Sequence, residues 1–99
     1  NAYIFPGVGL GVISSRSRRV TNEMFLAAAR TLAGQVTEAD LEQGRIYPPL
    51  SRIRYVSAAI AKEVAAIAYR DGLADREEPD DIQADVYAQV YQPVYPHYA

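Results

Sequence analysis

The sequence lacks cysteine and tryptophan altogether, and histidine, lysine and methionine each occur once, as His97, Lys62 and Met24. Without cysteine, the chain can form no disulfide, no thiolate metal site and no cysteine nucleophile. With one histidine, it cannot build a histidine-based metal cluster by itself. General acid–base chemistry is therefore left to carboxylates and tyrosines.

An excess of positive charge is also missing. Ten Lys and Arg stand against twelve Asp and Glu in 99 residues, and the net charge of −2 does not fit a nucleic-acid-binding surface. No apolar run approaches the roughly 18 residues of a membrane span, and no segment resembles a signal peptide. We therefore expect a cytoplasmic protein that binds neither nucleic acid nor membranes. Its length allows one domain with a modest core.

The first residues are apolar and rich in strand formers. Residues 2–5 predict a short buried strand that ends at Pro6-Gly7. A lone strand leaves its backbone unpaired, and no other segment offers a partner strand. Together with a first residue, Asn1, that is not Met, this strand indicates a piece of a larger protein.

The rest of the chain has the periodicity and the capping residues of helices. The predicted helices start at Pro6, at the caps Thr21 and Thr37 and near Leu50, and they end near Ser15, Gly34, Gly44 and Gly72. An acidic linker over residues 75–81 begins the last helix. Apolar stripes hold the last two helices to their neighbours, at residues 53, 56, 60, 64 and 67 and at residues 82, 86 and 90.

Glycines at positions 7, 9 and 11 look at first like a phosphate-binding loop. The dinucleotide fingerprint requires glycine at relative positions 1, 3 and 6, and here the sixth residue is Val12 or Ser14. We therefore favour close helix packing as the reason for these glycines. Val8, Val12 and Ile13 are expected to share one face of that helix.

Four other groups of residues are candidates for a site. A phosphate site at Arg16, Arg18 and Arg19 is conceivable, but arginines after a helix more often interact with its negative end and water. Lys62 and the linker 75–81 are interpreted as solvated, and His97 as a poor general base. The tail 91–99 alternates tyrosine with Pro93 and Pro96, so we predict an extended strip that docks on a partner surface.

Specific strings of the sequence resemble the C-terminal part of malic enzymes. The resemblance is carried by Asn1-Ala-Tyr-Ile-Phe-Pro-Gly-Val-Gly-Leu-Gly, Arg18-Arg-Val-Thr21, Met24-Phe25 and, most specifically, Gln43-Gly-Arg-Ile-Tyr-Pro-Pro-Leu50. Ser51-Arg-Ile-Arg-Tyr-Val-Ser57 and the ending Tyr91-Gln-Pro-Val-Tyr-Pro extend it over nearly the whole chain.

The resemblance implies a mainly α fold. Residues 1–72 would be the helical C-terminal portion of a Rossmann-like NAD(P)-binding domain with one short N-terminal strand. Residues 73–99 would be a small element, a terminal helix and an extended tail that reaches a neighbouring subunit of a dimer or tetramer.

The resemblance also implies a parent enzyme that oxidatively decarboxylates malate to pyruvate and CO2. That enzyme would use NAD or NADP, of which we favour NAD, and a divalent metal, Mg²⁺ or Mn²⁺. Asn1 matches an asparagine beside malate and the nicotinamide, so it is the one substrate- and cofactor-binding candidate. An amide suits that position because it donates to a carboxylate without adding charge. The family's catalytic and metal-binding residues lie upstream of Asn1, so the resemblance assigns none of them to this chain.

Two alternatives stay open from the sequence. In the first, the chain is a malic enzyme segment that partners with the rest of that enzyme; it is inactive alone and binds no cofactor or metal by itself. In the second, the chain is an independent α-helical interaction module without catalysis. In a self-sufficient module residues 1–12 would be buried within the monomer, whereas in a segment they would be exposed or paired with another chain.

Overall fold

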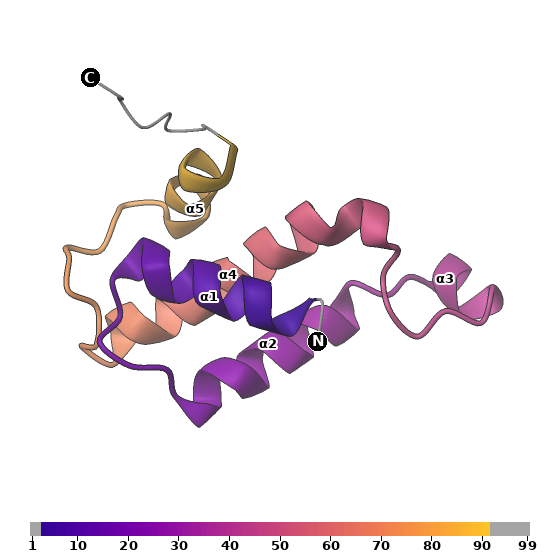
Figure 1. Ribbon diagram of the computed structural model, residues 1–99, viewed down its shortest axis with the longest axis horizontal. Helices are drawn as coiled ribbons and strands as arrows, with labels where there is room; N and C mark the ends of the chain where they lie inside the picture. The colour runs from indigo at the N-terminus through magenta and orange to yellow at the C-terminus, as the bar shows by residue number, and fades with distance from the viewer. Residues whose placement is uncertain (1–2, 92–99) are drawn as a thin grey trace, which may run out of the picture.

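The longest helix, α4 (Ile53–Arg70), lies at the centre of the fold, and α1, α2 and α5 pack around it (Figure 1). The computed structural model describes residues 3–91, without the side chain of the last of these. The other elements are α1 (Ile4–Ser15), α2 (Asn22–Gly34), α3 (Glu38–Glu42), the 3₁₀ turn η1 (Leu50–Arg52) and α5 (Ile82–Tyr91). Among the described residues, no helix has the length and apolar character needed to cross a membrane.

The core is built on the predicted stripe of α4. Val56, Ile60 and Val64 are completely buried, and Met24 and Ala28 of α2 pack against them. Burying such side chains is the main favourable contribution to folding. The prediction of a mainly α fold and of this stripe is therefore confirmed.

The prediction of an N-terminal strand is wrong for the residues that the structure describes. Tyr3 lies in a turn, and Ile4 and Phe5 already belong to α1. A strand needs a neighbour for its backbone hydrogen bonds, and no strand exists within residues 3–91. A helix satisfies its own backbone, and Pro6 is tolerated in the first turn because the N–H groups there have no intrahelical partner.

Glycine lets α1 pack closely on α4, as predicted. A Cβ built at Gly7 would lie 2.6 Å from the Ile60 Cβ, and one at Gly11 would lie 2.8 Å from the Ala61 carbonyl oxygen. A Cβ at Gly9 would meet nothing within 4 Å. Two glycines of the run are therefore explained by packing within the chain, and the third is not.

The caps of α2 and α3 were predicted correctly. The Thr21 hydroxyl accepts a hydrogen bond from the Met24 N–H at 3.2 Å, and the Thr37 hydroxyl accepts one from the Asp40 N–H at 3.1 Å. After α3, Gly44 takes a positive φ of 75°, which glycine adopts without strain. These signals are local, so the sequence alone was enough to find them.

The linker after α4 runs back along the end of α1. Ser17 and Ala74 form an isolated antiparallel bridge, with the Arg18 N–H 2.9 Å from the Leu73 carbonyl oxygen. In α5, Val86 is buried against Ala58 and Ala61 of α4. The division at residue 72 stays a prediction. The extended tail was predicted to begin at Tyr91, but that residue still belongs to α5, and residues 92–99 of the tail lie outside the described residues.

Candidate functional site

The one substrate- and cofactor-binding candidate, Asn1, lies outside the described residues, so its role stays a prediction. The closest described part of the chain is the amino end of α1. There the Tyr3 hydroxyl donates a hydrogen bond to the Pro48 carbonyl oxygen. The Tyr3 ring stacks on the Tyr47 ring, with centroids 6.2 Å apart and planes at 8°. The amino end of α1 is therefore tied to the segment between α3 and α4.

A hollow of about 260 Å³ opens beside this contact. It is lined by residues of α1, α2 and the segment before α4, namely Ile4, Ala29, Leu32, Ala33, Ile46 and Tyr47. The lining side chains are aliphatic apart from Tyr47, so the hollow suits hydrocarbon groups. A charged dicarboxylate or a phosphate would lose its hydration here without compensation.

Asp40 is the polar centre of the segment that carries Tyr47. Its carboxylate accepts a hydrogen bond from the Thr37 N–H at 2.9 Å and pairs with the Arg52 guanidinium at 2.7 Å. The Thr37 N–H hydrogen bond is the main cause that lowers the pKa of Asp40, assisted by the Thr37 hydroxyl and Arg52. Asp40 is therefore held as a carboxylate that links α3 to η1.

The glycine run does not form a phosphate cradle. Gly7 and Gly11 face Ile60 and Val64 of α4, and their N–H groups belong to the interior of α1. A phosphate loop would present free backbone N–H groups to an anion. The sequence interpretation of packing glycines is confirmed for these two positions, and we assign no dinucleotide contact to them.

Among the three arginines that follow α1, Arg16, Arg18 and Arg19, it is Arg18 whose side chain bonds to another part of the fold. Its guanidinium donates to the Gly72 carbonyl oxygen at 2.6 Å, just beyond the carboxyl end of α4. Arg16 ends α1 with a left-handed φ of 53°. An arginine near a helix carboxyl end was the interpretation favoured from the sequence, although the helix is α4 rather than the preceding one.

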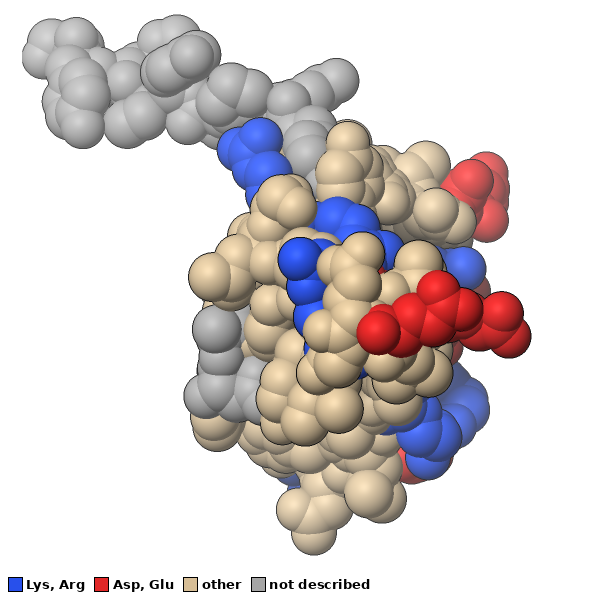
Figure 2. Space-filling model, turned by 90° about the vertical axis from the view of Figure 1, so that its right-hand side faces the viewer, with Lys and Arg blue, Asp and Glu red and all other residues tan. Residues whose placement is uncertain are grey.

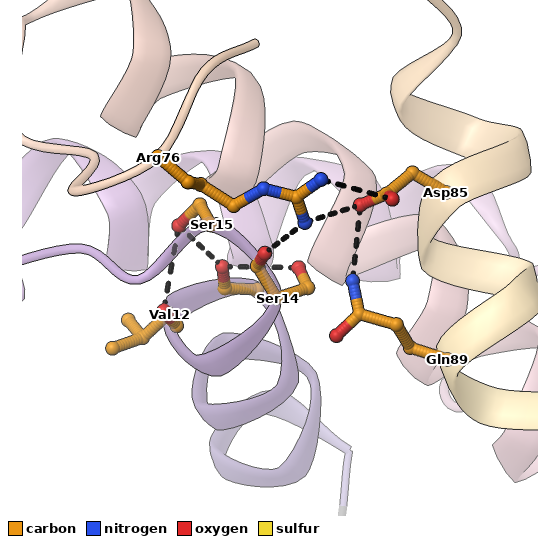
Figure 3. Close-up of polar contacts among 7 residues, drawn as sticks. Val12, Ser14, Ser15, Arg76, Asp85 and Gln89 are labelled. Carbon is orange, nitrogen blue, oxygen red and sulfur yellow. Dashed lines mark hydrogen bonds and ion pairs between the residues drawn. The ribbon is translucent and has the colours of Figure 1, made fainter. Parts of the chain in front are cut away.

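Arg76 in the linker connects two helices (Figure 3). Its guanidinium donates to the Ser14 carbonyl oxygen of α1 at 2.8 Å and to both carboxylate oxygens of Asp85 in α5, at 2.9 and 3.2 Å. Gln89 donates to the same carboxylate at 3.0 Å. The Asp85 hydrogen bond raises the pKa of Arg76. This bidentate contact holds α5 to the carboxyl end of α1.

The remaining candidates show no catalytic arrangement. Lys62 is half-buried on α4, and the carboxylates of Asp75 and Asp80 are exposed in the linker. Within residues 3–91, no group of three His, Cys, Asp or Glu could hold a metal ion. These residues do not fit the divalent metal that the resemblance implies, and we derive no metal-dependent step from them. His97 lies outside the described residues.

The face around α3 has no patch of a single charge sign (Figure 2). Basic side chains lie in several places across this face, acidic side chains project at one side, and most of the surface between them is uncharged (Figure 2). Such mixing gives no directional field for an anionic substrate.

Sequence reasoning missed the two ion pairs that organise the chain. The Asp40 network had a detectable signal, because threonine followed three residues later by an acidic side chain is a capping-box pattern. Its partner Arg52 could not be identified, since arginines are frequent in this stretch. The contact of Arg76 with Asp85 had no sequence signal, because it depends on where the linker turns.

The amino-acid sequence matches the model of a known family of nucleotide-binding domains. The family model described as the NAD binding domain of malic enzyme matches residues 1–69. The NADP-dependent malic enzyme of Populus trichocarpa is 50% identical over 99 residues, which are 99% of this chain and 17% of that protein. The human NADP-dependent mitochondrial malic enzyme is 50% identical over 96 residues, 96% of this chain and 16% of that protein.

An NAD-dependent relative is almost as similar. The mitochondrial NAD-dependent malic enzyme of Ascaris suum is 48% identical over 96 residues, which are 96% of this chain and 15% of that protein. The chain therefore belongs to the malic enzyme family. It spans only 15 to 17% of the length of these relatives.

Proposed function

We propose that this chain is the C-terminal segment of an enzyme that oxidatively decarboxylates malate to pyruvate and CO2 with NAD or NADP and a divalent metal. The observation that carries the proposal is the identity of about 50% with malic enzymes over nearly the whole chain. In this proposal Asn1 contacts malate beside the nicotinamide, and the metal and catalytic groups come from the rest of the enzyme.

The proposal also names the rest of the malic enzyme chain as the partner of α1 and α2. Phe5 and Ile13 of α1 are 62% and 72% exposed, and Leu26 of α2 is 59% exposed. Large apolar side chains on two neighbouring helices support an interaction surface. Phe5 contacts Phe25 edge to face, with centroids 5.9 Å apart, so the two helices present one surface at this point.

Gly9 supports the same partner. It follows Phe5 by one helical turn and precedes Ile13 by another, and a Cβ there would meet nothing within 4 Å. Glycine inside a helix costs about 1 kcal/mol relative to alanine, and no described contact compensates that cost. Close approach of another backbone to this face of α1 would explain the glycine.

Activity measurements test the proposal. The full-length enzyme that carries this segment is expected to form NADH or NADPH from malate when Mg²⁺ or Mn²⁺ is present, and the 99-residue chain alone is expected to form neither. Both dinucleotides are assayed, with NAD the expected coenzyme. A full-length enzyme without malate oxidation, or metal-dependent product formation by the 99-residue chain, would contradict the proposal.

The alternative function is an independent helical interaction module. Burial of Val8, Gly7 and Gly11 within the chain favours it, because part of α1 finds its partner without any other protein. Size-exclusion chromatography with thermal unfolding separates the two functions. A compact monomer with a high Tm fits the module, whereas self-association through the exposed face of α1 fits the segment.

For the proposed enzyme, we propose a cytoplasmic homodimer or homotetramer in which the C-terminal tail forms part of a subunit contact.

A further inference from the structure

Residues 36–50, which we call the arm, leave the helix bundle after α2 and return to it before α4. The arm carries α3, which lies beyond the ends of α2 and α4 (Figure 1). Among the described residues, α3 packs against none of the other α-helices. Isolated helices of fewer than about 12 residues are marginal in water, so this short helix needs support from outside itself.

The arm is fixed to the bundle at its base. The Asp40 carboxylate pairs with the Arg52 guanidinium at 2.7 Å, and the Tyr3 hydroxyl donates a hydrogen bond to the carbonyl oxygen of the buried residue Pro48. Pro48 and Pro49 also restrict the backbone here. These contacts hold the arm in one direction, so it presents a defined surface to its surroundings.

That surface is rich in apolar side chains. Four large ones are each more than half exposed, namely Leu41, Ile46, Tyr47 and Leu50. Exposed apolar side chains that gather in one short stretch mark an interaction surface. Ile46 and Tyr47 also form one wall of the hollow beside α1 and α2. Through these two residues the exposed surface of the arm continues into the hollow.

The hollow restricts what can bind there. Its lining carries no charged side chain, and its volume is about 260 Å³. A dry cavity of about 150 Å³ already holds a benzene molecule, so there is room for one large apolar side chain. A charged group would lose its hydration without compensation. The occupant is therefore an apolar side chain carried by another segment of polypeptide.

The comparisons indicate where that segment comes from. The arm and the hollow lie within residues 1–69, which match the NAD binding domain of malic enzyme. The chain spans only 15 to 17% of the length of its relatives, so most of such an enzyme lies outside it. A domain packs its elements around one shared core, and this makes the rest of the same enzyme chain the favoured source.

We propose that the arm and the hollow dock an apolar segment of the same malic enzyme chain, from outside these 99 residues, which inserts one large aliphatic or aromatic side chain into the hollow. The inference rests on the proposed function, in which this chain is a segment of such an enzyme. It adds a second docking surface to the one at Phe5, Gly9 and Ile13.

Hydrogen exchange tests whether the arm is covered. In the full-length enzyme, the backbone N–H groups of residues 41–47 should exchange at least about tenfold more slowly than in the isolated 99-residue chain, because docking removes them from water. The N–H groups in the middle of α4 should be protected in both proteins. Equally fast exchange of residues 41–47 in both would overturn the inference. Slow exchange already in the isolated chain would show that its own tail or a second copy covers the arm, and would overturn it too.

The double variant Ile46→Ser with Leu50→Ser tests the apolar contact. Both residues are exposed, so the Tm of the isolated chain should change by less than about 2 °C. In the full-length enzyme the Tm should fall by about 5 °C, because the docked segment loses its apolar partners. Val20→Ser makes the same kind of change at an exposed position before α2 and should alter neither Tm.

Two further outcomes separate this inference from its alternatives. An unchanged Tm of the full-length double variant would overturn it. Dissociation of an oligomeric enzyme at an unchanged Tm of the protomer would place a second copy on the arm and would overturn it as well. A wild-type enzyme without malate oxidation would refute the proposed function alone, since neither docking measurement needs malate.

Discussion

Gly11 of α1 lies against Val64 of α4 with no space for a side chain between them. A Cβ at Gly11 would come within 2.7 Å of the Val64 Cβ and 2.8 Å of the Ala61 carbonyl oxygen. A side chain could rotate away, but the carbonyl belongs to the backbone of α4 and cannot. Gly11, together with Gly7, therefore sets the distance between α1 and α4.

Gly11→Ala should destabilise the isolated chain. Overpacking costs typically about 1–3 kcal/mol, and the gain in helix propensity returns about 1 kcal/mol, so we expect a net loss of up to about 2 kcal/mol. Urea unfolding followed by circular dichroism measures it. Gly9→Ala is the matched control, because a methyl group there meets nothing, and it should be neutral or stabilising. Equal effects of both variants would contradict this packing.

Gly9→Leu tests the proposed contact between α1 and the rest of the enzyme. In the isolated chain the leucine would point into open space, and the Tm should change little. In the full-length enzyme the same side chain should collide with the approaching backbone and lower the Tm by several degrees. Thermal unfolding of both proteins gives the comparison, and an unchanged full-length Tm would argue for the interaction module.

Asp40 predicts a specific pH dependence of stability. Because its pKa is lowered in the folded chain, Asp40 contributes stability above its ordinary pKa of about 3.9, and this contribution is lost as the pH falls through the lowered value. Between pH 5 and pH 2, the free energy of unfolding should fall more steeply in the wild type than in Asp40→Asn. Asp80→Asn makes the same change at an exposed position of the linker and serves as the control variant. A wild-type slope in Asp40→Asn would contradict this role of Asp40.

Arg76→Met should release α5 without unfolding the rest. The variant keeps an apolar side chain but loses the hydrogen bonds to Ser14 and Asp85. Native-state hydrogen exchange should show faster exchange in α5 and unchanged protection in α4. Arg70→Met is the control, since its partners Glu23 and Asp71 lie on the surface, where ion pairs contribute little. Loss of protection throughout α4 would contradict a local role.

Asn1→Ala tests the one predicted contact with malate. In the full-length enzyme it should raise KM for malate or lower kcat, because the amide can no longer donate a hydrogen bond to the substrate. Steady-state kinetics with each dinucleotide distinguish an effect on malate from one on the coenzyme. Unchanged constants would remove this residue from the site.

The candidate site was predictable only in part. The string around Tyr47 identified the family, but nothing in its pattern indicated that Pro48 would accept a hydrogen bond from Tyr3. That contact joins residues 45 positions apart, and such pairs depend on the path of the chain rather than on local preference.

The sequence predicted Phe5 in a strand, but Phe5 lies in a helix. Its apolar character suits both structures, and only the presence or absence of a neighbouring strand could have decided between them.

By itself, the sequence determined the helices from Thr21 onward, the caps of α2 and α3 and the buried stripe of α4. These follow from short-range rules: a threonine hydroxyl reaches an N–H three residues away, and apolar residues at helical spacing share one face. The sequence also determined the family. Only the tertiary structure decided that Gly7 and Gly11 pack against α4, while no described residue packs against Gly9. It alone placed Arg76 between Ser14 and Asp85, because each of these roles depends on what another part of the chain brings within a few ångströms.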